Sequence, residues 1–71
     1  MTKENNIFGQ RLKAIRKSQG LSQETLAGML RIQVVNISRY ECGTQNPRMD
    51  LVKRIATCLG VPVSALFEEA A

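Results

Sequence analysis

Hydrophobic side chains recur along this chain with the three-to-four-residue period of amphipathic helices. Glycines follow three of these periodic runs, and a proline begins the last one, where it is tolerated in a first helical turn. The pattern predicts five helices joined by short connections, over about residues 6–18, 22–30, 33–42, 49–59 and 62–68. Five helices linked in this way indicate a compact all-α fold.

Residues 21–43 combine two short predicted helices with a turn too short to let them separate. Ser22 is a good N-cap residue for the first helix, and Gly43 ends the second. Ile32 lies in the turn and should fill the angle between them. This is the geometry of a helix-turn-helix, in which the second helix enters the DNA major groove. The expected inward positions of all the helices are Phe8, Leu12, Ile15, Leu26, Ala27, Leu30, Ile37, Tyr40, Leu51, Val52, Ile55, Ala56 and Leu59.

The helix at about residues 33–42 leaves a distinctive set of side chains facing outward. A guanidinium can bond both O6 and N7 of guanine, so Arg39 is a candidate base-reading residue, with a phosphate contact as its alternative. Val34 and Val35 can contact thymine methyl groups, although Val34 could instead pack against the preceding helix. Two further candidates complete the predicted base-reading face: Asn36, which could read adenine or bond a phosphate, and, more weakly, Ser38.

Five sequence segments then carry a resemblance to a known family: FGQRLKAIRKSQG, LSQETLA, NISRYECG, Asn46-Pro47 and CLGVPVSALF. The likeness that they carry extends over roughly residues 7–67, and the chain resembles the Cro/C1-type (XRE) family of phage and bacterial repressors. The resemblance implies a lambda-repressor-like five-helix domain, similar to small phage repressors and restriction-modification controller proteins. One departure is Arg31, which stands where the family usually has glycine, so that either a left-handed residue or a modified turn is expected.

Contacts to DNA phosphates are expected from residues that flank the outward helix face. Gln23 stands at a helix N-terminus, where backbone N–H groups favour an anion, and the family uses the matching glutamine in this way. The resemblance also implies an ion pair between Arg16 and Glu41, which would leave Arg16 near a phosphate. Gln33 is as suited to capping its helix as to touching DNA. The loop after the second helix adds candidates that could equally be a solvated turn: Thr44, Gln45, Asn46 and Arg48.

Charge and composition support this interpretation. The 71 residues carry a net charge of +4 and a pI near 9.6, with +4 in residues 1–20, +1 in 21–48 and −1 in 49–71. Together with a helix-turn-helix, this basic excess indicates an electrostatic footprint for phosphates. The length predicts a single domain over residues 1–71, with an ordered core at about 7–67.

Several classes of function are disfavoured by the residue types present. The chain has no histidine, and its two cysteines, Cys42 and Cys58, lack zinc-ligand spacing, so no metal or other cofactor is expected. The acidic residues show no catalytic spacing, which argues against an enzyme. No apolar run is long enough to span a membrane and no small-molecule ligand is evident, so a cytoplasmic protein with free thiols is expected.

The sequence therefore predicts a sequence-specific double-stranded DNA-binding regulator of transcription. One short helix reads only a few base pairs, so a homodimer on a two-fold symmetric operator is expected. RNA polymerase is a candidate further partner. The alternative is a protein-interaction module on the same fold, such as an antitoxin or anti-repressor. The candidates for the dimer interface are Val61, Val63, Leu66 and Phe67, some of which must also belong to the core.

Overall fold

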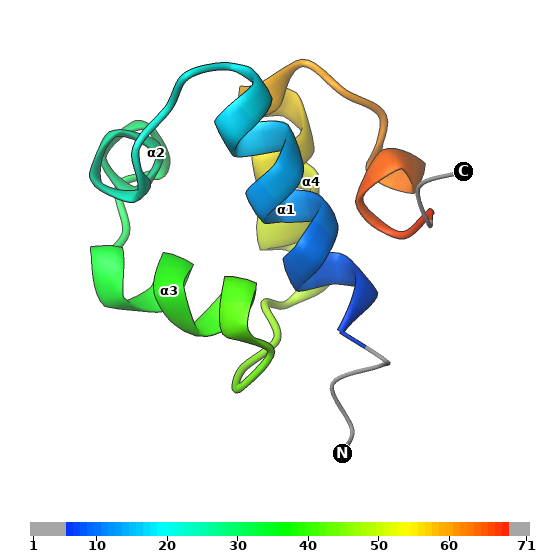
Figure 1. Cartoon of the computed structure of the whole chain (residues 1–71), viewed down its shortest axis with the longest axis horizontal. Helices are drawn as coiled ribbons and strands as arrows, with labels where there is room; N and C mark the ends of the chain where they lie inside the picture. Colours follow the sequence, from blue (N-terminus) through cyan, green and yellow to red (C-terminus); the bar gives the residue numbers. More distant parts are fainter. Residues whose placement is uncertain (1–5, 69–71) are drawn as a thin grey trace.

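The computed structural model describes residues 6–68 and shows four α-helices followed by a short 3₁₀ turn (Figure 1). The helices are α1 (Ile7–Ser18), α2 (Gln23–Leu30), α3 (Val34–Cys42) and α4 (Met49–Leu59). All four lie where the hydrophobic period predicts them, with end points that differ by at most one residue. The described residues contain no strand, so the all-α prediction is confirmed for this part of the chain.

The predicted fifth helix is wrong. The segment after Pro62 forms only a 3₁₀ turn, Val63–Leu66, held by backbone bonds from Ala65 N to Pro62 O and from Phe67 N to Ser64 O. A run this short closes too few i to i−4 hydrogen bonds to offset the cost of helix nucleation. The fold is thus four helices and a turn.

Local capping explains where α1 and α2 begin. The Ser22 side chain accepts a hydrogen bond from the backbone N–H of Thr25 and caps α2. The Asn6 side chain accepts one from the Gly9 N–H, at 3.2 Å, and caps α1. Each cap satisfies a backbone donor that has no partner within its own helix.

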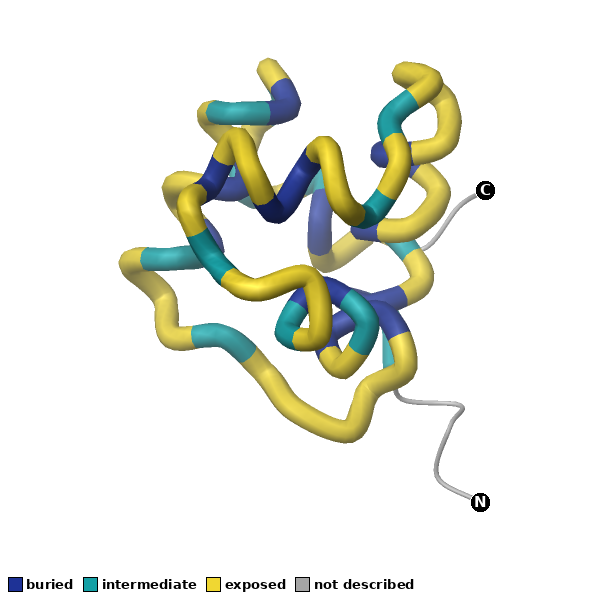
Figure 2. The backbone as a smooth tube through the Cα atoms, turned by 90° about the vertical axis from the view of Figure 1, so that its left-hand side faces the viewer, coloured by how far each residue is buried: buried dark blue, intermediate teal, exposed yellow. Residues whose placement is uncertain are grey.

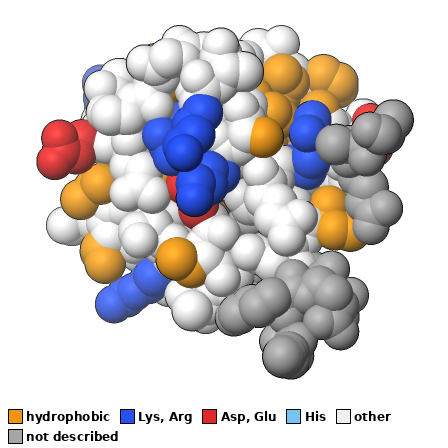
Figure 3. Space-filling view, in the orientation of Figure 1, with side chains coloured by type: hydrophobic (Ala, Val, Ile, Leu, Met, Phe, Trp, Pro, Cys, Tyr) orange, Lys and Arg blue, Asp and Glu red, His pale blue; other side chains and the backbone are white. Residues whose placement is uncertain are grey.

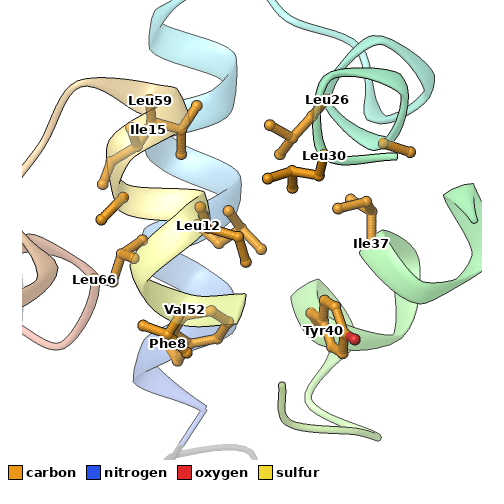
Figure 4. Close-up of a cluster of buried hydrophobic side chains, with 13 residues drawn as sticks. Phe8, Leu12, Ile15, Leu26, Leu30, Ile37, Tyr40, Val52, Leu59 and Leu66 are labelled. Atoms are coloured by element: carbon orange, nitrogen blue, oxygen red, sulfur yellow. The ribbon is translucent and has the colours of Figure 1, made fainter. Parts of the chain in front are cut away.

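One hydrophobic core joins all the elements. Its thirteen buried side chains come from α1, α2, α3, α4 and the 3₁₀ turn (Figure 4). Figure 4 shows side chains of α1 and α4 facing those of α2 and α3, and along the backbone the buried positions recur at helical spacing (Figure 2). The predicted inward positions are confirmed as buried, except Leu51, which like Cys58 is half-buried against the core. Leu66 is an additional core residue from the 3₁₀ turn.

Helices α1 and α3 approach each other closely at Gly9. A Cβ atom added there would lie 2.5 Å from the Tyr40 carbonyl oxygen and 2.7 Å from that of Glu41. Asn6 reinforces the contact, because its Nδ2 donates to the Glu41 carbonyl oxygen at 3.1 Å. The first turn of α1 is therefore fastened to the last turn of α3.

No helix within residues 6–68 has the length and apolar character needed to cross a bilayer.

Candidate nucleic-acid interface

Helix α3 presents an outer face that combines apolar and basic side chains. Val34 and Val35 are 41% and 46% exposed, and Arg39 is also exposed. The exposed part of Val34 is available for a contact with DNA, whereas packing of its remaining surface against α2 stays the alternative. Asn36 and Ser38 flank these residues and are half-buried. Hydrophobic and basic side chains lie together over α3 at the lower left of the molecule (Figure 3).

The turn between α2 and α3 is set by one residue in a left-handed conformation. Arg31 has φ 60° and ψ 43°, and it is the one non-glycine residue among those described with a positive φ. The following residue, Ile32, donates its backbone N–H to the Ala27 carbonyl oxygen at 3.0 Å and packs partly against the core. Of the two outcomes expected for Arg31, the left-handed residue is therefore the one found, and Ile32 fills the angle between the helices as predicted.

A buried polar network lies behind this face. The Arg16 guanidinium donates from Nε to Glu41 Oε2 at 2.6 Å and from Nη2 to Glu41 Oε1 at 3.1 Å. The two side chains are only 7% and 3% exposed. The ion pair that the family resemblance implies is thus present. A desolvated, bidentate pair of this kind holds its geometry much better than an exposed one.

Two further hydrogen bonds extend the network to α2. Arg16 Nη1 donates to the Leu21 carbonyl oxygen at 2.7 Å, and Gln23 Nε2 donates to Glu41 Oε1 at 3.0 Å. Gln23 itself is half-buried at the N-terminus of α2. The Arg16 side chain is turned inward. It is therefore poorly placed to bind a phosphate, more so than any other predicted phosphate ligand.

Gln33 and the predicted phosphate ligands of the loop after α3 stand on either side of α3 along the chain, and all are exposed except Asn46, which is half-buried. Gln33 makes no side-chain capping bond, so the alternative that it caps α3 is not found. The loop between α3 and α4 is exposed at Thr44, Gln45 and Arg48. Thr44 Oγ1 also donates to the Arg39 carbonyl oxygen at 3.4 Å. Gln33 and this loop thus stand next to the two ends of α3 along the chain, and Gln23 is joined to α3 by its hydrogen bond to Glu41.

The residues predicted for a dimer interface do not form one exposed surface. Leu66 is fully buried, so the prediction that it lies in an interface is wrong, because the 3₁₀ turn directs it into the core. Val61 and Val63 are half-buried against the same core. Phe67 is 47% exposed, and its ring centroid lies 5.5 Å from that of Phe8.

Sequence reasoning missed several side chains that bind backbone carbonyl groups. Arg11 donates to the Ala65 carbonyl oxygen at 3.1 Å, Gln19 to that of Leu59 at 2.6 Å, and Arg54 to that of Leu30. No local sequence pattern predicts such contacts, because the donor and acceptor residues are 24 to 54 positions apart in the sequence. Asn6 did carry a signal, since asparagine before an amphipathic run is a typical N-cap.

Comparison with known proteins places this geometry among regulators. The family model HTH_3, described as Helix-turn-helix, matches residues 12–66. The chain is 34% identical over 62 residues to YonR, an HTH-type transcriptional regulator of SPbeta prophage origin from Bacillus subtilis, covering 87% of this chain and 57% of YonR. It is 29% identical to RstR, the transcriptional repressor of the cryptic phage CTXphi from Vibrio cholerae, covering 89% of this chain and 57% of RstR. The chain therefore spans a little over half the length of these curated relatives.

A solved structure gives a fuller match. The restriction-modification controller protein C.AhdI from Aeromonas hydrophila superimposes with a TM-score of 0.84 at 34% identity, covering 90% of this chain and 97% of that one. The names of these three proteins describe control of transcription or of restriction-modification, and none names an enzyme.

Proposed function

Because this chain belongs to the HTH_3 helix-turn-helix family, of the Cro/C1 (XRE) type, we propose that it binds a specific double-stranded DNA sequence and regulates transcription there. The observation that carries the proposal is the outer face of α3, which exposes two valines and an arginine between two groups of polar residues. Exposed apolar side chains beside a cation gain nothing from contact with water. They do match the edges of base pairs in the major groove, where thymine presents a methyl group and guanine presents two hydrogen-bond acceptors.

In this proposal α3 reads the bases. Arg39 bonds guanine through O6 and N7, and Val34 and Val35 contact thymine methyl groups, so the site contains G and T beneath these residues. Asn36 and Ser38 add contacts at the edge of the face. Phosphates on either side are held by Gln23 at the N-terminus of α2, by Gln33, and by the loop residues Thr44, Gln45, Asn46 and Arg48.

We further propose that two copies bind a two-fold symmetric operator. A helix of nine residues reads only a few base pairs, and two half-sites one helical turn apart supply the remaining affinity. Phe67, Val61 and Val63 are the candidates for the contact between copies, now without Leu66. RNA polymerase remains a candidate partner of the bound dimer.

The experiment that tests this proposal is selection of bound sequences from a random duplex pool, followed by titration of the recovered site at several salt concentrations. We expect an inverted repeat containing G and T in each half. Its affinity should fall steeply with salt, with a logarithmic slope of about −0.9 for each phosphate neutralised. Recovery of no consensus, with salt-insensitive capture of a protein instead, would favour the protein-interaction alternative.

A further inference from the structure

The network of Arg16, Glu41 and Gln23 joins three helices directly behind the proposed DNA-binding face. We propose that Glu41 is a positioning residue for phosphate binding: it holds the Gln23 carboxamide so that one N–H points to the protein and the other is free for a DNA phosphate. This inference rests on the proposed function. It assigns Glu41 a role beyond its ion pair with Arg16.

The chemistry of the bond defines which way the carboxamide is turned. The Glu41 carboxylate can only accept hydrogen bonds, so the Gln23 atom at 3.0 Å from Oε1 is the nitrogen. A primary amide nitrogen carries two N–H groups, and this contact uses one of them. Gln23 is half-buried, at the first position of α2, where the helix dipole favours an anion. The second N–H therefore adds a side-chain donor to a backbone site already suited to phosphate.

The charge balance of the network also suits an anionic ligand. A free carboxylate beside the phosphate site would repel DNA. Both Glu41 oxygens accept from Arg16, at 2.6 and 3.1 Å, so the carboxylate is neutralised inside the protein. Arg16 thus has the role of holding Glu41, and Glu41 that of holding Gln23.

The same network sets the distance between the two parts of the interface. Glu41 lies in the last turn of α3, while Arg16 also donates to the carbonyl oxygen of Leu21, just before the N-cap of α2. The phosphate-binding end of α2 and the recognition helix are therefore tied to one buried ion pair. Side chains positioned in this way lose less conformational entropy on binding.

A methylphosphonate scan of the selected DNA site provides the test. Each phosphate is replaced in turn by the neutral methylphosphonate, and affinity is measured for the wild-type protein and for Gln23→Met. We expect one position in each half-site at which the methylphosphonate lowers the affinity of the wild type about tenfold. This factor corresponds to the loss of one charge-assisted hydrogen bond. Gln23→Met should bind unmodified DNA about tenfold more weakly, and its further loss of affinity at that position should be clearly smaller than that of the wild type, because only the backbone N–H contact remains there.

Gln19→Met is the matched control, because the Gln19 carboxamide also donates one N–H to the protein, to the Leu59 carbonyl oxygen at the end of α4. This variant should keep the wild-type affinity and the full methylphosphonate effect. If it changed both as Gln23→Met does, the loss would come from general destabilisation and not from a phosphate contact, and the proposal would be overturned.

The positioning role itself is tested with Glu41→Gln, which keeps the shape of the side chain but presents an N–H where one carboxylate oxygen accepts. We expect the methylphosphonate effect at the Gln23 position to fall from about tenfold to below about threefold. Effects at the other phosphates and the base preference should persist. A Glu41 that only stabilised the fold would instead lower affinity evenly and leave the tenfold effect in place, which would contradict the proposal.

Glu41→Gln removes the partner of a buried cation, so the variant could fail to fold. A measurement on the wild type then decides the question. In the ¹H–¹⁵N correlation spectrum of the Gln23 side chain, the amide proton that is hydrogen-bonded to Glu41 should keep its chemical shift when DNA is added. The second amide proton should change its chemical shift and become protected from exchange with solvent. If the chemical shift of the first proton changed as well, the carboxamide would have left Glu41 to bind DNA, and the inference would fail.

Failure of this inference is distinguishable from failure of the proposed function. If the wild type selects no DNA sequence, the proposed function fails. If it binds its site specifically but no phosphate effect depends on Gln23, the positioning role fails alone.

Discussion

At the scale of single residues, the turn of the helix-turn-helix carries a local cost. Arg31 has φ 60° at the C-terminus of α2, a conformation that costs an L-residue with a Cβ about 1–2 kcal/mol. Gly43 and Gly60 end α3 and α4 in the same conformation without that cost. The chain tolerates the arginine because Ile32 and the core hold the turn in place.

Replacing this arginine should stabilise the domain. We expect Arg31→Gly to raise the free energy of unfolding by about 1 kcal/mol, because the backbone strain disappears while no buried contact is lost. Urea or thermal denaturation measures the change. Arg31→Ala is the control, since it removes the charge but keeps the Cβ; an equal gain from alanine would attribute the effect to charge and not to the backbone.

Arg39 is the residue whose replacement should change specificity. Arg39→Ala should cost about 1–3 kcal/mol of binding free energy and relax the preference at one base pair in each half-site. Repeating the selection with this variant gives the measurement. Arg48→Ala is the comparison, because loss of a phosphate contact weakens binding to all sequences alike; the same uniform loss for Arg39→Ala would make it a phosphate ligand as well.

At the scale of the elements, the packing of α1 against α3 positions the recognition helix. The contact depends on Gly9, where a side chain would meet backbone carbonyl oxygens of Tyr40 and Glu41, and on the Asn6 cap. Backbone atoms cannot rotate away as a side chain can. The position of α3 is therefore sensitive to the size of one residue in a different helix.

Two glycine-to-alanine variants separate this contact from ordinary helix propensity. Gly9→Ala should lower the free energy of unfolding by about 1–3 kcal/mol through overpacking. Gly28→Ala, in the exposed part of α2 with no atom within 4 Å of the new Cβ, should raise it by about 0.5–1 kcal/mol. Denaturation of both variants checks the prediction, and a stabilising Gly9→Ala would show that the two helices separate easily.

At the scale of the whole molecule, the end of the described chain offers a surface beside the core. The ring of Phe67 lies beside that of Phe8 and is about half exposed, while Leu66 next to it is fully buried. In the proposed dimer Phe67 would bury its exposed area against a second copy. The same ring would then contribute to the fold and to assembly.

Phe67→Glu should therefore yield monomers. A carboxylate at this position cannot be buried between two copies without a large desolvation cost. Sedimentation velocity measures the change, and circular dichroism confirms that the helices remain. Met49→Glu is the matched control, because Met49 is similarly exposed but lies at the start of α4. A dimer that persists in Phe67→Glu would place the interface elsewhere.

Much of this fold follows from the sequence alone, because the relevant interactions are local. The bounds of α1 to α4 depend on hydrophobic period and capping residues such as Ser22 and Gly43, which act within about four residues of themselves. The outward position of Val35 and Arg39 follows from the same helical geometry. For Arg31 the sequence defined two outcomes, and the structure shows the left-handed one.

Only the tertiary structure decided which side chains meet across the molecule. It placed Leu66 in the core and left Phe67 exposed, because a 3₁₀ turn and a helix direct the same residues differently. It also turned Arg16 inward and joined Gln23 to Glu41 across 18 positions of sequence. Such contacts depend on how the helices pack in three dimensions. The sequence pattern of one helix does not predict which residue of another helix its side chains contact.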